Sequence, residues 1–408
     1  MIGSDPIDVS ASSRQPAKLF DAININTGLV LFSESQQFML TTDSDSFTPL
    51  TAKINNLAYY NFNVKTNPVS LGTSIGFLDN AGKKSRFWEM ADVVRQGEPN
   101  VIEQSAVVAK LFESDLTQIS NSEENGIIFF SEEGSSTLYG YKYFQNIRER
   151  KLAAWFKWTL TGEIQYHCMQ DDSLFVVVKN GTKYQMLKYS LKMDANTYSL
   201  HDNRVHLDHL MKVTSLASSA FSGGKTTFTK PTGLESSNQL VAYDIDDSAN
   251  PPVAIGRFAD VSVNGNNLEI TGDWTGQDFL IGYEYTMSVT LPTIYYKVTE
   301  NKRVTADTRA HTVIHRVKIG FGPVGVYETT LQRIGRPDYT ELFEVTPANT
   351  VLANSPGVFN DEIQRTIPIY ERNINATITI KSTHPAPATM HNYTWEGVYT
   401  DNFYKKIG

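Results

Sequence analysis

Between Leu29 and Leu191 the chain repeats one pattern of apolar and polar positions four times. In each repeat an apolar run leads through a polar cluster rich in turn-forming residues to a second apolar or aromatic run. The paired runs are Leu29–Phe32 with Phe38–Leu40, Ser74–Leu78 with Arg86–Trp88, Ile127–Phe130 with Leu138–Tyr141, and Leu174–Val178 with Tyr184–Leu187. This pattern is typical of a β-hairpin.

The repeats begin at residues 29, 74, 127 and 174, with spacings of 45, 53 and 47 residues. Strand-containing repeats of ~40–50 residues predict successive β-propeller blades.

A second β region is predicted after about Met193, where the repeat ends. A hairpin is expected about Asn264-Gly265-Asn266, and alternate apolar positions from Tyr283 to Leu291 predict one half-buried strand. Strands with one polar face suit the wall of a sandwich or barrel. Two less regular segments are also expected, a short helix at Asp208–Val213 and a long mobile loop over 221–237, which is rich in Gly, Ser, Thr and Lys.

The domain organisation predicted from these patterns has three parts. Residues 1–18 are small, polar and irregular, and are interpreted as a linker from an upstream portion. Residues 19–192 are predicted to form β-propeller blades, and residues 193–408 a β-rich region of sandwich or barrel type. Four hairpins are few for a propeller, which usually has about 4–8 blades of four strands. We therefore expect the chain to be the C-terminal part of a longer protein.

Composition narrows the class of protein to an all-β one with an acidic surface. Aromatic residues make up 11% of the 408 residues, and the net charge is −8. An acidic chain argues against a general nucleic-acid-binding surface, because phosphates are neutralised by basic side chains, although local contact with DNA stays open. Cys168 is the only cysteine, which leaves no disulfide framework and fits folding in a reducing cytoplasm. No apolar run approaches the ~20 residues that cross a bilayer.

Several short motifs resemble chemical sites, and each has a simpler interpretation. The stretch Ser222–Thr226 resembles the end of a phosphate-binding loop, but position 219 is serine where the pattern needs glycine, so a flexible loop is favoured. The cluster of His201, His206, Asp208 and His209 matches no known metal-ligand spacing and is interpreted as solvated. Acidic pairs occur at Glu123-Glu124, Glu132-Glu133, Asp171-Asp172 and within Asp244–Asp247. Most of them lie in turn-like segments, and catalytic carboxylate pairs are placed by tertiary geometry. The sequence predicts no catalytic residue, cofactor site or metal site.

Four tryptophans, Trp88, Trp155, Trp158 and Trp395, stand out among the aromatic residues. They could form platforms on which sugars stack, but packing within the sheets or at contacts between subunits is favoured.

Several stretches taken together resemble the tail tubular protein B, or nozzle, family of short-tailed bacteriophages. They are Asp5–Ser10, Asn26–Ser33, Arg86–Met90, Ala154–Trp158 and Trp395–Tyr404. The resemblance spans most of the chain and is weakest between about 195 and 310. It implies a β-propeller combined with β-rich platform and nozzle domains, in a hexameric ring around a channel for double-stranded DNA. Family members are usually longer and carry an N-terminal portion that is absent here.

The resemblance implies a structural virion protein at the tail tip, without enzymatic activity or cofactors and made in the host bacterial cytoplasm. The implied partners are further copies of the chain, an upstream adaptor resembling tail tubular protein A, and the tail fibres. DNA would pass without sequence recognition through a channel that opens on infection. We expect gating to involve the loop with Gly223, Gly224, Lys225 and Lys230, whose lysines could contact the DNA backbone.

Two other functions are open from the sequence. One is a carbohydrate-binding or glycan-degrading tail protein, which requires two carboxylates across a cleft lined by Trp or Tyr. The other is a monomeric propeller scaffold that binds cellular proteins.

Overall fold

The computed structural model describes residues 16–25, 28–42, 47–80, 82–91, 93, 98–112, 115–145, 150–193, 198–200, 203–245, 256–300, 303–345 and 362–401. Their regular structure consists of β-strands and three short 3₁₀ turns, η1 (Ala106–Val108), η2 (Ser218–Ala220) and η3 (Asn373–Asn375), so the all-β prediction is confirmed. The chain divides into two compact units, Met1–Met193 and Asp194–Gly408. Over the described residues, no helix has the length and apolar character needed to cross a membrane.

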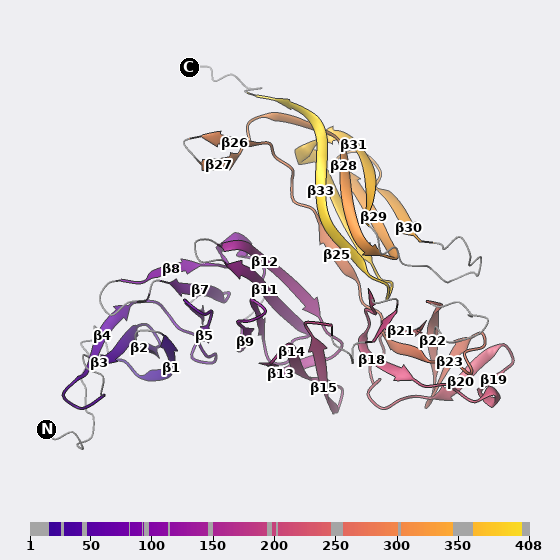
Figure 1. Ribbon diagram of the computed structural model, residues 1–408, viewed down its shortest axis with the longest axis horizontal. Coiled ribbons are helices and arrows are strands. Elements are labelled where there is room, and N and C mark those ends of the chain that lie inside the picture. The colour runs from indigo at the N-terminus through magenta and orange to yellow at the C-terminus, as the bar shows by residue number, and fades with distance from the viewer. Residues whose placement is uncertain are drawn as a thin grey trace. The chain divides into compact units, whose positions relative to one another are not determined.

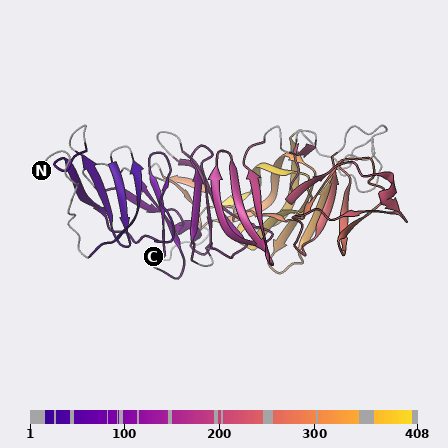
Figure 2. The same cartoon turned by 90° about the horizontal axis from the view of Figure 1, so that it is seen from below.

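The first unit consists of four antiparallel sheets that follow one another along the chain (Figures 1 and 2). The first contains β1 (Leu19–Ile25), β2 (Gly28–Ser33), β3 (Gln37–Thr42) and β4 (Ala52–Ala58), and the second β5 (Val69–Ser70), β6 (Ile75–Asp79), β7 (Arg86–Ala91) and β8 (Asn100–Glu103). The third contains β9 (Gln118–Ser122), β10 (Ile127–Ser131), β11 (Thr137–Gln145) and β12 (Arg150–Thr159), and the fourth β13 (Glu163–Gln170), β14 (Ser173–Asn180) and β15 (Lys183–Ser190). In each sheet, strands that are consecutive in sequence are neighbours.

All four predicted hairpins are confirmed as β2–β3, β6–β7, β10–β11 and β14–β15. Their registers pair Leu31 with Phe38, Phe77 with Trp88, Phe130 with Tyr139, and Val178 with Gln185. Each hairpin forms two neighbouring strands of one sheet, so one sequence repeat corresponds to one sheet.

Neighbouring sheets of the first unit are held together by shared apolar cores. One core joins the first and second sheets, a second joins the second and third, and a third joins the third and fourth. The strand β10 shows how this works, because Ile128 and Phe130 point into one core while Ile127 and Phe129 point into the other. A strand that is covered on both faces needs a continuous apolar run. This explains why apolar and polar residues do not alternate along the strands of these hairpins.

The second unit begins with a seven-stranded sheet in the order β18-β24-β21-β22-β23-β20-β19. Its strands are β18 (Asp208–Val213), β19 (Phe221–Ser222), β20 (Lys225–Thr229), β21 (Leu240–Asp244), β22 (Phe258–Asn264), β23 (Asn267–Thr271) and β24 (Phe279–Tyr283). The hairpin predicted about Asn264-Gly265-Asn266 is confirmed as β22–β23. The core of this sheet contains the fully buried Trp274.

Two predictions in this sheet are wrong. Asp208–Val213 is a strand and not a helix, because it pairs with β24 and this tertiary pairing overrides local preference. The stretch 221–237 is not one loop, because it contains the hairpin β19–β20, and β20 pairs with β23. Its threonines are good strand formers, and Thr226 is completely buried.

The second part of this unit is a sandwich of two sheets around one core. One sheet has the order β25 (Met287–Thr290), β32 (Ala376–Ser382), β29 (Val326–Arg333), β30 (Tyr339–Glu344), and the other the order β31 (Ile363–Arg372), β28 (His311–Val324), β33 (Ala388–Thr400). Buried residues of both sheets, such as Val317, Ile319 and Ile380, make up the core. The small hairpins β16 (Ser199–Leu200)–β17 (Asn203–Arg204) and β26 (Lys297–Glu300)–β27 (Arg303–Ala306) complete the described strands.

The single strand predicted from Tyr283 to Leu291 is also wrong. Tyr283 ends β24 in the seven-stranded sheet, whereas Met287 begins β25 in the sandwich. The alternation of polar and apolar residues continues through the connection, and this concealed the change of sheet. The seven-stranded sheet and the sandwich contact each other at the loop after β32, where the ring of His384 lies against Tyr243 and Phe258.

Some predicted features lie outside the described residues. They are residues 1–15 of the expected linker, the resemblance stretch Asp5–Ser10, His201, Asp246, Asp247 and residues 402–404.

Candidate functional site

The glycines of the expected gate, Gly223 and Gly224, form the two-residue turn between β19 and β20. Ser222 pairs with Lys225 across this turn. Both glycines have positive φ angles, 61° and 79°. Two successive positive φ values are typical of the hairpin turns whose twist matches that of the flanking strands. The turn is exposed at the edge of the seven-stranded sheet, so the expected loop is a short hairpin tip.

Both lysines of this candidate have a carboxylate nearby in the same chain. Lys225 Nζ lies 3.0 Å from Glu269 Oε2, and Lys230 Nζ lies 3.9 Å from Glu235 Oε2. Glu269 also accepts a hydrogen bond of 2.7 Å from Asn264, and these two contacts lower the pKa of its carboxyl group, that from Asn264 more strongly. Each lysine charge is therefore balanced locally, which weakens the attraction of the hairpin for phosphate.

Alanine at Gly224 is expected to destabilise the β19–β20 hairpin by about 1–2 kcal/mol, because an L-residue is disfavoured in the left-handed region. An added Cβ at Gly224 would meet open space, so the effect would come from the backbone alone. Hydrogen exchange of the β19 and β20 amides measures this loss of hairpin stability. Gly82→Ala is the matched control, because Gly82 does not have the left-handed φ and its nearest neighbour would be 3.7 Å from the new Cβ. Equal exchange in the two variants would contradict the expectation.

The tryptophans of the first unit pack inside it. Trp88 on β7 donates a hydrogen bond of 3.2 Å to Asp79, and its ring centre lies 5.2 Å from that of Tyr60. Trp155 on β12 lies 4.5 Å from Tyr141 and donates to the backbone oxygen of Gln104 at 3.3 Å. Both tryptophans are therefore packed against residues of their own subunit.

The two remaining tryptophans are also packed. The ring of Trp158 on β12 lies 5.4 Å from Phe129 and 6.1 Å from Tyr189 of the fourth sheet. Trp395 on β33 is partly buried against the core of the sandwich. Whether any of the four also contacts a second subunit stays a prediction.

Sequence reasoning missed the stacked pair of Arg257 and Trp274. The Arg257 guanidinium lies 3.7 Å from the centre of the buried Trp274 ring and donates a hydrogen bond of 2.8 Å to the Asp273 carbonyl. The only sequence signal is a tryptophan between two glycines in Gly272–Gly276, which is ordinary turn composition. The pair packs one end of the seven-stranded sheet.

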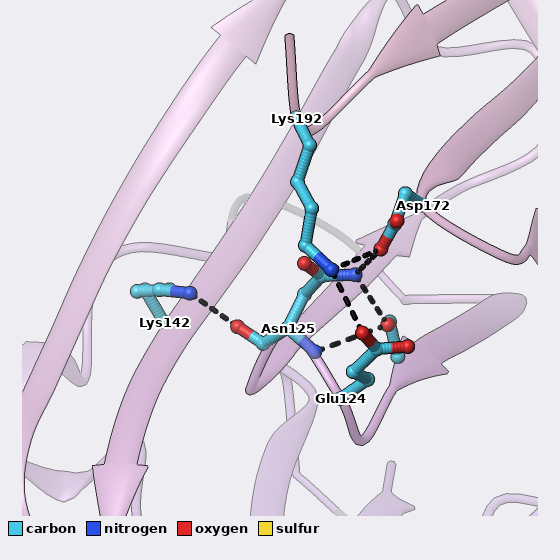
Figure 3. Close-up of polar contacts among 6 residues, drawn as sticks. Glu124, Asn125, Lys142, Asp172 and Lys192 are labelled. Carbon is cyan, nitrogen blue, oxygen red and sulfur yellow. Dashed lines mark hydrogen bonds and ion pairs between the residues drawn. The ribbon is translucent and has the colours of Figure 1, made fainter. Parts of the chain in front are cut away.

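Two of the predicted acidic pairs meet at a polar cluster that joins the third and fourth sheets (Figure 3). Lys192 Nζ, just after β15, lies 2.8 Å from Glu124 Oε1 and 2.9 Å from Asp172 Oδ1. Asn125, in the β9–β10 turn, donates a hydrogen bond of 2.9 Å to Asp172, and its backbone oxygen accepts one from Lys142. We call these residues the Lys192 cluster.

Charges in the Lys192 cluster stabilise one another. The hydrogen bonds from Lys192 and Asn125 lower the pKa of Asp172, and the hydrogen bonds to Glu124 and Asp172 raise the pKa of Lys192. The ions stay exposed to solvent, so the cluster fixes how the two turns lie and provides little stability.

The described residues contain no group of three or more His, Cys, Asp and Glu side chains arranged to hold a metal ion. The interpretation of the histidine cluster as solvated is wrong for Asp208 and His209, because both are buried and the His209 ring lies 5.4 Å from that of Tyr283. A cleft of about 490 Å³ beside the second sheet has a single carboxylate, Glu103, among its lining residues, and neither Trp nor Tyr. This cleft therefore lacks the pair of carboxylates that glycoside hydrolysis requires.

Comparison with known proteins identifies the family. The model of the bacteriophage nozzle protein family matches residues 1–405. A curated relative, the tail tubular protein gp12 of Escherichia phage T7, is 22% identical over 216 residues, which are 52% of this chain and 27% of the T7 protein. The match thus spans about a quarter of that relative's length.

Solved structures give only distant likeness. Two structures of an exo-β-1,3-galactanase from Phanerochaete chrysosporium align at 9% and 10% identity, with TM-scores of 0.21 and 0.22. They cover 79% and 90% of this chain, and 93% and 78% of the galactanase chains. Likeness at this level carries no argument about fold or activity.

The expected resemblance is thus confirmed by the family match and the T7 relative together. The family is by name one of bacteriophage nozzle proteins, and the T7 relative is by name a tail tubular protein. The chain belongs to the bacteriophage nozzle protein family.

Proposed function

We propose that this chain is a subunit of the ring-shaped nozzle at the distal end of a short phage tail, where it forms and gates the channel for double-stranded DNA. The observation that carries the proposal is the family match over residues 1–405. The nozzle is closed before infection and opens when the genome passes.

The charge of the chain suits a conduit that DNA leaves without delay. Each phosphate neutralised by Lys or Arg adds affinity through counterion release, so a basic lining would retain the duplex. Six copies at −8 each carry −48, and the part of this charge that faces the channel repels DNA. The pairing of Lys225 with Glu269 and of Lys230 with Glu235 reduces retention further, so the β19–β20 tip can face the channel as a gate element.

The four sheets of residues 19–192 are the blades of a β-propeller in this proposal. Two observations support this assignment: consecutive strands are neighbours in every sheet, and each pair of neighbouring sheets shares an apolar core. Residues 193–408 form the platform and nozzle. The exposed end face of the fourth sheet, with Tyr166, Tyr184 and Met186, leaves room for a further blade.

The proposed partners follow from this position in the tail. Copies of the chain form a six-membered ring, an adaptor resembling tail tubular protein A lies upstream, and tail fibres attach nearby. The protein is made and folded in the host cytoplasm before assembly. Closed cyclic symmetry buries contacts between copies that would otherwise stay exposed.

The test is electron microscopy of complete tails labelled with antibodies raised against residues 256–300. We expect labelled six-fold particles at the tail tip, at a site distal to the adaptor. Label on the capsid, on the fibres or at a ring of another symmetry would refute the proposal. Release of sugars from capsule or cell-wall polysaccharide by the purified chain would favour a glycan-degrading protein instead.

A further inference from the structure

One end of the sandwich is built from two loops that lie side by side. The first is the turn between β29 and β30, which contains Ile334 and Arg336, and the second is η3, which contains Ile374. The backbone nitrogen of Ile334 donates a hydrogen bond of 3.0 Å to the backbone oxygen of Asn375. This bond brings the two isoleucine-bearing loops together, and we call them the Ile334–Ile374 end.

The Ile334–Ile374 end lies away from the seven-stranded sheet of the same unit. The strand β32 begins directly after η3 and ends at Ser382, and beyond it the ring of His384 lies against Tyr243 and Phe258 of the seven-stranded sheet. The loop after β32 is thus the end that contacts the seven-stranded sheet. Seven residues of strand span about 23 Å, so the Ile334–Ile374 end projects from the other side of the sandwich.

Apolar side chains are unusually exposed at this end. Ile334 is 73% exposed and Ile374 54%, and Tyr370, at the end of β31, is 62% exposed. One exposed isoleucine is ordinary on a protein surface. Here two isoleucines come from separate loops that a hydrogen bond joins. Together they form a small apolar tip that is exposed on the surface.

Arginines surround this tip on an otherwise acidic chain. Arg333, Arg336 and Arg372 lie in or beside the two loops, together with the carboxylates Glu371 and Asp338, which leaves a local charge of +1. Glu371 accepts hydrogen bonds from Arg372 N at 2.9 Å and Asn375 Nδ2 at 3.4 Å, while Arg336 lies 3.8 Å away. The Arg336 side chain is 52% exposed, but Glu371 balances part of its charge, as Glu235 does for Lys230. The attraction of this end for an external anion therefore depends on the net local charge of +1.

We propose that the Ile334–Ile374 end is a membrane-contact site that inserts its isoleucines into the surface of an anionic lipid bilayer. Apolar tips inserted at the headgroup boundary, with basic residues attracted to anionic lipid, are how peripheral proteins bind membranes. A DNA duplex takes up isoleucine only by unstacking base pairs, at a cost of a few kcal/mol per step, whereas the boundary between lipid headgroups and acyl chains accepts it directly. A stable protein interface buries about 1,200–2,000 Å², more than two isoleucines and a tyrosine supply, whereas lipid insertion requires only the tip.

The test is sedimentation of the full chain with lipid vesicles. Vesicles of phosphatidylcholine with phosphatidylglycerol are compared with vesicles of phosphatidylcholine alone, at low and at physiological salt. The intact chain is expected to bind the anionic vesicles more tightly, and the excess should fall as salt screens the arginines. Replacing both isoleucines with serine, as Ile334→Ser with Ile374→Ser, is expected to lower the partition at least about tenfold.

Two further variants separate this site from general stickiness. Val107→Ser is the matched apolar control, because Val107 is 85% exposed on η1 of the first unit, and it should bind as the unaltered chain does. Arg336→Gln should weaken binding to anionic vesicles several-fold and leave binding to neutral vesicles unchanged. The proposal fails if the intact chain does not bind the anionic vesicles, or if the double serine variant and Val107→Ser bind equally. Thermal unfolding checks that all variants are folded.

Discussion

Replacing Phe87 with alanine is expected to lower the free energy of unfolding of the first unit by about 3–5 kcal/mol. Phe87 is completely buried on β7 and belongs to the core that joins the second and third sheets. Its ring centre lies 5.1 Å from that of Phe130 and 5.8 Å from that of Tyr141, both on the third sheet. The substitution leaves a cavity at the junction of two sheets, where the backbone of neither can collapse freely to fill it.

Hydrogen exchange of the amides in the third sheet measures this loss, because it reports the free energy of opening for one unit separately from the other. Phe144→Ala is the control, since Phe144 is the same residue type in the same unit but is 58% exposed. Its effect should stay within about 0.5 kcal/mol, as for most surface substitutions. If the two variants open equally easily, the shared core does not hold the sheets together.

The first unit could be predicted from sequence because its hairpins are local. Each repeat places both strands and the turn within about twenty residues, so pairing such as that of Phe77 with Trp88 follows from the order of the chain. The run from Ile127 to Phe130 was recognised as one strand of a hairpin, and the structure explains its continuous apolar character by two cores, one on each face. The sequence could not show which sheets share a core, because those contacts join residues of different repeats.

The errors lie where distant pairing decides the structure. The segment Asp208–Val213 is a strand only because β24, some seventy residues later, provides its partner. The alternation from Tyr283 to Leu291 has the correct period, but the connection at Glu284–Thr286 passes from one sheet to another. Local periodicity carries no information about which sheet a strand joins.

Candidate sites were the hardest feature to predict. Gly223 and Gly224 were expected in a mobile gating loop, whereas they form the turn of a hairpin. The carboxylates that pair with Lys225 and Lys230 come from other positions in the chain. The Lys192 cluster likewise joins residues about fifty to seventy positions apart (Figure 3). Acidic pairs in the sequence indicated the turns, and only the fold shows that two of these turns share one lysine.

Acidification from pH 7 to 5 is expected to destabilise the first unit by about 2 kcal/mol through His167 alone. His167 is 2% exposed between the third and fourth sheets, with Nδ1 2.7 Å from Ser120 Oγ. Burial lowers its pKa from 6.5 to about 4. Above pH 6.5 the ring is neutral in both states and this effect is absent. As pH falls from 6.5 to about 4, the unfolded chain gains a proton that the folded chain does not bind, so stability is lost progressively.

The variant His167→Gln should remove this part of the pH dependence. Glutamine does not titrate, so its opening free energy, measured by hydrogen exchange over β9 to β15, should change less between pH 7 and 5 than that of the unaltered chain. His391→Gln, on the exposed strand β33 of the other unit, is the control and should retain the full dependence of the first unit. An identical pH dependence in His167→Gln and the unaltered chain would mean that His167 takes up its proton in the folded state, in contact with water that reaches the junction of the sheets.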